Sequence, residues 1–355
     1  MKKAMIAMSG GVDSSLAAKL MKDKGFDCIG CTMKLYNNED AGMERSRTCC
    51  SLDDVEDARS VAYKLGMPFY VFNFTDAFHD TVIRKFIESY ENGITPNPCI
   101  DCNRYMKFDK LFERAKILGC DYIVTGHYAR IEEQDGKFVL KKALDETKDQ
   151  SYVLYSMTQE LLAHTIFPLG SMRKTEVRAI AEESGFVNAD KPDSQDICFV
   201  PNGDYVGVIE LNTGKKPNFG NFVDKQGNVL GRHKGVIHYT IGQRKGLGIS
   251  HAEPLYVCGI CPASDIVVLG RNDDLFRREA DVSDFNWISG EIPQSEFRCK
   301  AKIRYRQKEQ WANVIPTGAD TVHVTFDEPQ RAITPGQAAV LYDGDTVLGG
   351  GTIQG

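Results

Sequence analysis

A chain of 355 residues, 42% hydrophobic and 26% charged, has the composition of a soluble globular protein and is long enough for two or three domains. No hydrophobic run reaches the length of a membrane span, and the apolar N-terminal stretch breaks at glycines too early for a signal peptide. The net charge of −6 disfavours a nucleic-acid partner unless positive charge is concentrated locally. Eleven cysteines without a secretory signal favour a reducing compartment, so we expect a cytoplasmic protein.

The first third of the chain alternates strand and helix patterns. Apolar strands are predicted over residues 3–8, 27–36, 68–74 and 121–129, and helices over 14–25, 51–66, 75–92 and 104–119. This rhythm predicts a parallel sheet with helices on both faces. Ligands of such sheets bind beyond the carboxyl ends of the strands, which here are Met8–Ser9, Met33 and Gly126–His127.

The pattern changes near residue 200. Short glycine-rich strands follow up to about residue 270, and β-branched and aromatic residues then alternate between turn signals. We expect an α/β domain over residues 1–200, a small central domain over 201–270, and a C-terminal all-β barrel or sandwich over 271–355.

The segment SGGVDSS, residues 9–15, lies between the first strand and the first helix. Its glycines let the backbone approach a phosphate, and the serine hydroxyls and the helix N-terminus supply donors for an anion. Asp13 could hold a metal ion that bridges phosphates. A plain glycine turn is the alternative, but six specified residues at a strand–helix junction form a far more specific signal.

SGGVDS resembles the PP-loop of the N-type ATP pyrophosphatases, which have an adenine nucleotide alpha-hydrolase-like fold and leave AMP on a substrate oxygen as pyrophosphate departs. No GKS or GKT follows, so the loop is not a Walker motif. Six further segments resemble, in order, motifs of the tRNA-specific 2-thiouridylases: PNPCIDCNRYMKF, TGHYA, KDQSYVLY, DSQDICF, YTIGQRKGLGI and PGQAAVLY. The resemblance spans about residues 9–342. It implies that the domain over residues 1–200 binds ATP and is catalytic, and that the central domain over 201–270 binds tRNA. It implies ATP-dependent 2-thiolation of the wobble uridine (U34) of tRNA, through adenylation of uridine O2 and sulfur transfer from a cysteine persulfide.

Three C-x-x-C pairs raise the question of a metal or redox site. Cys28/Cys31 lies in a predicted strand, where residues three apart face opposite sides, and Cys258/Cys261 lies in a similar apolar run; we interpret both pairs, with Cys299, as core residues. Cys99/Cys102 falls in a predicted loop that could turn both sulfurs to one side, and Cys198 falls in another. The residues alone favour a reactive and a structural role for Cys102 equally.

The resemblance implies that Cys198 carries the persulfide and that Cys102 releases its sulfur by forming a disulfide with Cys198. It also implies Mg²⁺ with ATP, and a sulfur donor such as a cysteine desulfurase or a sulfur-relay protein. Cys99 departs from the family pattern, which often has Asp there. With Cys102 and Cys198 it could supply three thiolates to an iron–sulfur (4Fe-4S) cluster with one open iron, so both routes stay open.

The resemblance assigns the other site residues one by one. Matches to nucleotide contacts, besides the catalytic candidate Asp13 itself, are Ala7, Met8, Ser9, Gly10, Gly11, Val12, Ser14, Met33 and Gly126. Asn97, Pro98 and Cys99 match the stretch that meets the target base. The remaining matches to tRNA contacts are His127, Lys148, Asp149, Gln150, Tyr305, Arg306 and Gln337. A lone His127 is more often structural, but its position after a strand end favours a functional role.

Basic residues recur at every second position near the C-terminus, at Lys300, Lys302, Arg304, Arg306 and Lys308. On one continuous strand all five side chains would project from one face. We therefore expect them to contact tRNA phosphates rather than only solvent. Two other functions remain to be weighed. An amide-forming synthetase with the same loop would not need the cysteine pair or the basic strand. A non-catalytic RNA-binding protein would not need an intact SGGVDS.

Overall fold

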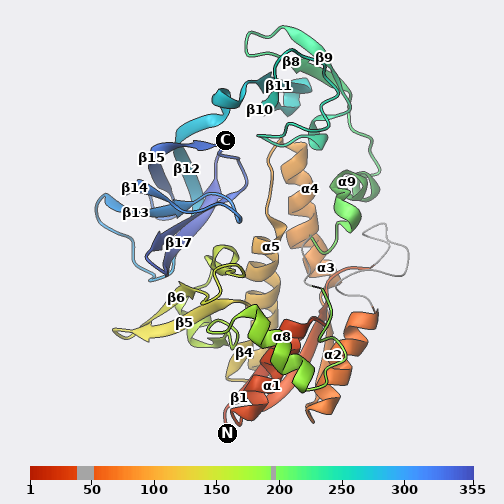
Figure 1. Ribbon diagram of the computed structural model, residues 1–355, viewed down its shortest axis with the longest axis vertical. Helices are drawn as coiled ribbons and strands as arrows, with labels where there is room; N and C mark the ends of the chain where they lie inside the picture. Colours follow the sequence, from red (N-terminus) through yellow and green to blue (C-terminus); the bar gives the residue numbers. More distant parts are fainter. Residues whose placement is uncertain (38–51, 193–196) are drawn as a thin grey trace.

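The computed structural model describes residues 1–37, 52–192 and 197–355 (Figure 1). A five-stranded parallel sheet organises the N-terminal region, in the order β3-β2-β1-β4-β7. Its strands are β1 Lys3–Ala7, β2 Asp27–Lys34, β3 Phe69–Asn73, β4 Tyr122–Val124 and β7 Thr165–Ile166. The predicted parallel sheet is confirmed, and its strand order reverses direction between β1 and β4.

Helices cover both faces of this sheet, as predicted. Buried residues of α1 (Val12–Asp23), α2 (Leu52–Lys64) and α8 (Lys174–Glu183) pack on one face, and those of α6 (Leu111–Ile117) pack on the other. Cys28 belongs to the first cluster and Cys31 to the second, which confirms that this pair faces opposite sides of β2. In the described part of the chain, no helix is both long and apolar enough to cross a membrane.

Two helical columns rise from the sheet toward the central region (Figure 1). The first consists of α3 Thr75–Phe78, the π-helix η1 His79–Ile83 and α4 Arg84–Glu91. The second consists of α5 Pro98–Asp101, the π-helix η2 Cys102–Lys110 and α6. Shorter helices are η3 Ser151–Leu154, α7 Gln159–Ala163, η4 Pro201–Gly203, α9 Tyr205–Thr213, η5 Val236–His238, η6 Pro262–Ser264 and η7 Asn272–Leu275.

The central region is a four-stranded sheet in the order β10-β11-β8-β9. Its strands are β8 Gly220–Val223, β9 Val229–His233, β10 Tyr256–Cys261 and β11 Ile266–Gly270. One hydrophobic cluster joins this sheet to the first helical column, because Phe222 and Val257 pack in the same core as Val82 and Phe86. The central region is therefore anchored directly on the first helical column of the N-terminal region.

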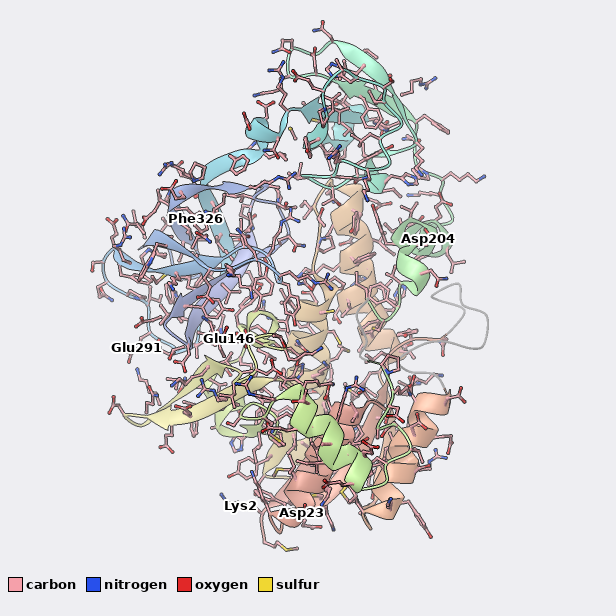
Figure 2. All side chains as sticks on the ribbon, viewed as in Figure 1. Lys2, Asp23, Glu146, Asp204, Glu291 and Phe326 are labelled. Atoms are coloured by element: carbon pink, nitrogen blue, oxygen red, sulfur yellow. The ribbon has the colours of Figure 1, made fainter. Side chains whose placement is uncertain are left out.

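Six C-terminal strands form a closed barrel, since β12 pairs with both β15 and β17. They are β12 Phe276–Trp287, β13 Phe297–Lys302, β14 Gln310–Pro316, β15 Val322–Arg331, β16 Ala338–Asp343 and β17 Thr346–Ile353. Phe326, labelled in Figure 2, is 1% exposed in the cluster that fills the barrel. The barrel expectation is confirmed over the sandwich.

One hairpin from the N-terminal region joins this barrel. Its strands are β5 Ala129–Gln134 and β6 Lys137–Lys142, and β6 pairs with β17. Arg130 reinforces the junction with an ion pair to Asp345, at 2.6 Å between Nη2 and Oδ2. The division of the chain at residues 200 and 270 stays a prediction. The hairpin belongs to the first of these three parts of the chain but pairs with a strand of the third, and it thereby fixes the barrel against the segment that follows β4.

The prediction of five basic side chains on one strand face is wrong. Strand β13 ends at Lys302, and residues 303–309 turn toward β14. Arg304 points inward: its Nη2 donates to Thr334 Oγ1 at 2.5 Å, to Ala332 O at 3.1 Å and to Ile241 O at 3.4 Å. Alternation in sequence is a local signal, whereas these acceptors come from distant segments. Arg306 and Lys308 are exposed.

The cysteines of the later strands are only partly core. Cys299 is 2% exposed, as expected. Cys258 is half-buried, and Cys261 is exposed at the end of β10. The core interpretation is therefore wrong for Cys261, because the strand ends there and Pro262 begins a turn.

Replacing Arg304 by Ala should lower the free energy of unfolding by about 1–3 kcal/mol, because three acceptors at the junction of barrel and central region lose a charged donor. Urea unfolding followed by circular dichroism measures this. Arg306→Ala, a neighbouring exposed arginine, is the matched control and should change stability by less than about 0.5 kcal/mol. Equal effects of the two substitutions would contradict the structural role of Arg304.

Candidate active site

The phosphate loop, residues 9–15, is held closed by its own serines. Ser14 Oγ and Ser15 Oγ donate to the Gly11 carbonyl at 3.0 and 3.1 Å, and Ser9 N donates to Ser14 Oγ at 3.1 Å. Gly11 is the N-cap of α1 and offers no side chain to the first N–H groups of the helix. Uncapped N–H groups and the helix dipole favour an anion at this end of β1, and nucleotide binding there stays a prediction.

Two glycines set how closely other segments approach this loop. Gly10 has a φ of +76°, and a Cβ there would lie 2.4 Å from the Asp54 carbonyl oxygen. A Cβ on Gly126 would lie 2.9 Å from Asp13 C and from Ser14 N. The end of β4 therefore lies against the first turn of α1, at the point where the strand order reverses and where such sheets bind ligands.

The Asp13 carboxylate is bound by two partners that the sequence did not predict. Lys174 Nζ contacts Oδ1 at 2.7 Å and Oδ2 at 2.8 Å, and Tyr128 OH donates to Oδ1 at 2.8 Å. Lys174 is 7% exposed at the start of α8, 161 residues along the chain from Asp13. No local motif signals such a contact. A metal role for Asp13 stays a prediction.

A second set of residues that are distant in the sequence supports the phosphate loop. Asn188 is 2% exposed, and its Nδ2 donates to Gly10 O and to Ser15 Oγ, both at 2.9 Å. Lys191 forms ion pairs with Asp54 and Asp57 at the start of α2. This segment leads toward Cys198; residues 193–196 of the DSQDICF motif lie outside the described part of the chain.

The loop prediction for Cys99 and Cys102 is wrong, because both lie on a helix. Asn97 Oδ1 accepts a hydrogen bond from Cys99 N at 3.2 Å, and Pro98 occupies the first helical position. An Asn cap followed by Pro is a helix-start signal that sequence reasoning missed. We name residues 98–110, α5 with η2, the cysteine helix. Residues three apart on a helix share a side, so the two thiols still face the same way.

The two thiols differ in exposure. Cys99 is exposed, whereas Cys102 is half-buried and is the first residue of the π-helix. Burial raises the pKa of the Cys102 thiol to about 11, and the positive charge of Lys107 acts in the opposite direction. Cys102 is thus largely protonated at neutral pH, and a thiolate forms there only with nearby positive charge or a base.

His127 follows Gly126 and is 7% exposed. Its Nε2 lies 3.4 Å from Lys107 Nζ, and its Nδ1 lies 2.6 Å from Thr125 Oγ1. Burial lowers the pKa of His127 well below its ordinary value, and Lys107 lowers it further, so the imidazole is neutral. A tRNA contact of His127 stays a prediction; in this structure it joins the end of β4 to the cysteine helix.

Cys102 and Cys198 pack against one hydrophobic cluster, which contains Phe78, Met106 and Phe199. Cys198 is half-buried in a turn, and its carbonyl accepts a hydrogen bond from Tyr36 OH at 2.6 Å. Cys102 and Cys198 are not joined by a disulfide in this structure. Among the described residues, no three His, Cys, Asp or Glu side chains are grouped closely enough to hold a metal ion. Iron–sulfur ligation by Cys99, Cys102 and Cys198 stays a prediction.

Predicted tRNA-contact residues from separate segments gather near the exposed side of the cysteine helix. Tyr305 OH donates to Asp149 O at 3.3 Å. Burial raises the pKa of Tyr305, and the neighbouring Asp149 and Cys99 raise it further. Tyr305 and Arg306 remain exposed at the turn after β13. This turn therefore flanks the Cys99 thiol.

Three other predicted tRNA residues use their side chains within the fold. Asp149 Oδ1 accepts from Ala143 N at 3.0 Å, and Gln150 Oε1 accepts from Tyr128 N at 2.9 Å. Gln337 Nε2 donates to Thr95 O at 2.9 Å, directly before the cysteine helix. Lys148 and Met33 are half-buried. Contacts of these residues with tRNA, and of Met33 with adenosine, stay predictions.

A cavity of about 230 Å³ lies behind the cysteine helix, between it and the end of the barrel. The helix contributes to its lining with Asn97, Ile100, Asp101 and Arg104. These positions recur at helical spacing and form a face that does not include Cys99 or Cys102. The cavity is therefore separate from the thiols.

Gly126→Ala should weaken ATP binding by about tenfold, roughly 1.4 kcal/mol, because the new methyl group would push the Asp13–Ser14 backbone out of its anion-binding geometry. Isothermal titration with ATP measures the dissociation constant. Gly259→Ala is the control, since its Cβ would make ordinary 3.5 Å contacts with Val268 in the central sheet. Unchanged ATP affinity in Gly126→Ala would show that this close approach does not shape the site.

Three family models match the chain in succession. They are the tRNA methyl transferase HUP domain over residues 2–202, the tRNA methyl transferase PRC-barrel domain over 209–271, and the aminomethyltransferase beta-barrel domain over 277–353. A solved 4-thiouridine synthetase bound to RNA and ATP covers 60% of this chain and 52% of its own length, at 18% identity and a TM-score of 0.37, a likeness too low to bear on function.

Curated relatives match the chain from end to end. The tRNA-specific 2-thiouridylase MnmA of Clostridioides difficile is 51% identical over 355 residues, covering 99% of this chain and 98% of the relative. The protein of the same name from Clostridium acetobutylicum is 50% identical and covers 99% of both chains. That of Symbiobacterium thermophilum is 51% identical and covers 99% of this chain and 92% of its own. The chain therefore belongs to the family of the tRNA-specific 2-thiouridylases.

Proposed function

We propose that this chain is an ATP-dependent tRNA 2-thiouridylase that modifies the wobble uridine through adenylation followed by sulfur transfer. One observation carries the proposal: the phosphate loop and the cysteine helix meet through Gly126 and His127. Gly126 lies against the start of α1, and His127 lies against Lys107 of the cysteine helix. Activation and sulfur transfer can thus act on a single bound uridine.

In the first step the phosphate loop binds ATP. The N–H groups at the start of α1 and the loop backbone hold the phosphates in place. Uridine O2 attacks the α-phosphorus, pyrophosphate leaves, and AMP remains bonded to O2. This converts O2 from a poor leaving group into part of a good one.

Mg²⁺ accompanies ATP in this proposal. One or two carboxylates together with substrate phosphates are sufficient to bind it, and Asp13 fits as one such ligand beside the phosphate loop. Lys174 holds both oxygens of Asp13 in the structure, so metal binding would require this ion pair to open. The ion would neutralise phosphate charge, while the loop and the start of α1 orient the nucleotide.

In the second step the terminal sulfur of a Cys198 persulfide attacks C2, and AMP leaves with O2. The Cys102 thiolate then attacks Cys198 Sγ, which frees the sulfur on the uridine and forms a Cys102–Cys198 disulfide. Cys102 and Cys198 both border the hydrophobic cluster that contains Met106 and Phe199, and the pairing of their two thiols follows from the proposed chemistry. A thiol reductant must reopen the disulfide, and a persulfide donor must reload Cys198.

We prefer the persulfide route to the iron–sulfur route. The described residues do not assemble three candidate ligands, so we derive no step through a cluster. The donor is a protein that carries a persulfide, such as a cysteine desulfurase or a sulfur-relay protein. An exposed Cys99 beside a half-buried Cys102 is consistent with delivery from outside.

Cys102→Ser and Cys198→Ser should each still release pyrophosphate and AMP when tRNA is present, but should form no 2-thiouridine. Activation uses the phosphate loop and uridine O2 and needs no thiol. Pyrophosphate release with and without tRNA, and nucleoside mass spectrometry of the same reactions, measure the two steps. Pyrophosphate release at the same rate with and without tRNA would favour another PP-loop enzyme. No pyrophosphate release under either condition would favour a non-catalytic RNA-binding protein.

Cys99→Ser separates the two sulfur routes. In the persulfide route it should only slow thiolation, since Cys99 is a neighbour. In the cluster route it should abolish thiolation and the iron absorbance of anaerobically purified protein. Cys261→Ser, an exposed thiol on the central sheet, should behave as the wild type in every assay. Stoichiometric iron and sulfide, lost together with activity in Cys99→Ser, would overturn the persulfide preference.

Arg306→Ala with Lys308→Ala should weaken tRNA binding and flatten its salt dependence, by about one unit of log–log slope for each lost phosphate contact. Both side chains are exposed at the turn near Cys99 and Asp149, whereas Arg304 is engaged within the fold. Filter binding at several salt concentrations gives the slope. Lys116→Ala, on α6, should leave it unchanged. Weaker binding at an unaltered slope would mean that these cations do not neutralise phosphates.

A further inference from the structure

Among the described residues, Lys107 has no carboxylate partner, whereas other lysines around the site do. Those partnerships are Lys85 with Asp101, Lys174 with Asp13, and Lys191 with Asp54 and Asp57. Lys107 is half-buried, and no carboxylate of the described residues forms an ion pair with it. An unpaired charge in such a position is costly, and a bound anion would offset that cost.

The π-helix places Lys107 on the side of the cysteine helix that carries Cys102. In a π-helix the hydrogen bonds join residues five apart, so Cys102 and Lys107 lie above one another on η2. In an α-helix residues three and four apart share a side, and residue 107 would be rotated away from residue 102. Single-turn π segments are the usual form, and they are frequent at functional sites, so nine π-helical residues here are notable.

His127 orients the Lys107 ammonium. An ammonium has only donors, so Nε2 of the neutral imidazole accepts from Lys107 at 3.4 Å, and Nδ1 carries the hydrogen that Thr125 Oγ1 accepts. One of the three ammonium hydrogens is thereby used, and two remain for a ligand. A neutral partner leaves the full positive charge of Lys107 available.

The place of Lys107 defines which anion it meets. His127 follows Gly126, which lies against Asp13 and Ser14 of the phosphate loop, while Cys102 lies one π-helical turn away from Lys107. In the proposed reaction the phosphate bonded to uridine O2 must lie between that loop and the sulfur that attacks C2. We propose that Lys107 is a catalytic residue that binds the α-phosphate as it becomes attached to uridine O2, an inference that rests on the proposed function.

Lys107 then acts in both steps. It stabilises the charge on the α-phosphate while the bond from phosphorus to pyrophosphate breaks and the bond from phosphorus to O2 forms. It stabilises the same phosphate again when the C2–O2 bond breaks and AMP leaves. Fixed donors aimed at developing charge are a large source of rate acceleration.

Lys107→Met removes the charge and retains most of the length of the side chain. In single-turnover reactions we expect tRNA-dependent pyrophosphate release to slow by about 100-fold, the scale for loss of one preorganised donor. The dissociation constant of tRNA should change by less than about threefold. Lys107→Arg should retain more activity than Lys107→Met. Lys110→Met, on the same π-helix but next to Glu113, should release pyrophosphate at the wild-type rate.

Amine rescue separates a phosphate contact from a structural role. Ethylammonium should restore pyrophosphate release to Lys107→Ala, whereas tetramethylammonium, which has no N–H donor, should not. A side chain that only supports the fold would give no such difference. Urea midpoints of all variants show whether each is folded as the wild type.

Three outcomes would overturn the proposal. The first is wild-type pyrophosphate release by folded Lys107→Met. The second is absence of amine rescue in folded Lys107→Ala. The third is loss of 2-thiouridine in Lys107→Met while pyrophosphate release is unaltered, which would mean that the positive charge acts on the sulfur instead of the phosphate. A wild-type chain that neither releases pyrophosphate with tRNA nor forms 2-thiouridine would refute the proposed function itself. The two failures are therefore distinguishable.

Discussion

The contact between the Gly126 backbone and the first turn of α1 is the constraint on which the site depends. It exists because the strand order reverses between β1 and β4, which leaves the two strand ends open beside each other. A side chain at residue 126 would collide with Asp13 and Ser14, so only glycine permits this approach. Through His127 and Lys107 the same contact sets the distance between the nucleotide loop and the thiols.

The barrel supports the start of the cysteine helix. Thr95 N donates to Pro335 O at 3.0 Å, and Gln337 Nε2 returns a bond to Thr95 O at 2.9 Å. Gly336, with a φ of +88°, leaves room for Ile94, since a Cβ there would lie 2.3 Å from Ile94 Cγ2. The pairing of β6 with β17 fixes the barrel from the other side. The position of the barrel relative to the cysteine helix is therefore fixed by contacts at both of these places.

Hydrophobic periodicity and glycine turns are local signals, and they predicted the parallel sheet, the glycine turn between β1 and α1, and an all-β C-terminal region. Closure of that region into a barrel was not decided by them, because it depends on the pairing of the distant strands β12 and β17. Contacts between distant residues were not predictable: Lys174 lies 161 residues from Asp13, and Asn188 lies 178 residues from Gly10. Arg304 points inward because its acceptors come from other segments of the chain, so the alternation of basic residues in the sequence gave a wrong prediction for its side chain. The helix start at Asn97–Pro98 was readable from a cap signal, whereas the π-helix has no sequence signature.

The central claim is that activation and sulfur transfer occur on one uridine in one site. A pulse–chase experiment tests it: the wild-type chain is given α-labelled ATP and tRNA without sulfur donor, then persulfide donor with excess unlabelled ATP and competitor tRNA. The account predicts that labelled AMP–tRNA accumulates in the pulse and is converted during the chase to 2-thiouridine and labelled AMP without leaving the protein. Labelled adduct that dissociates before thiolation, or 2-thiouridine that forms only on the competitor tRNA, would contradict it.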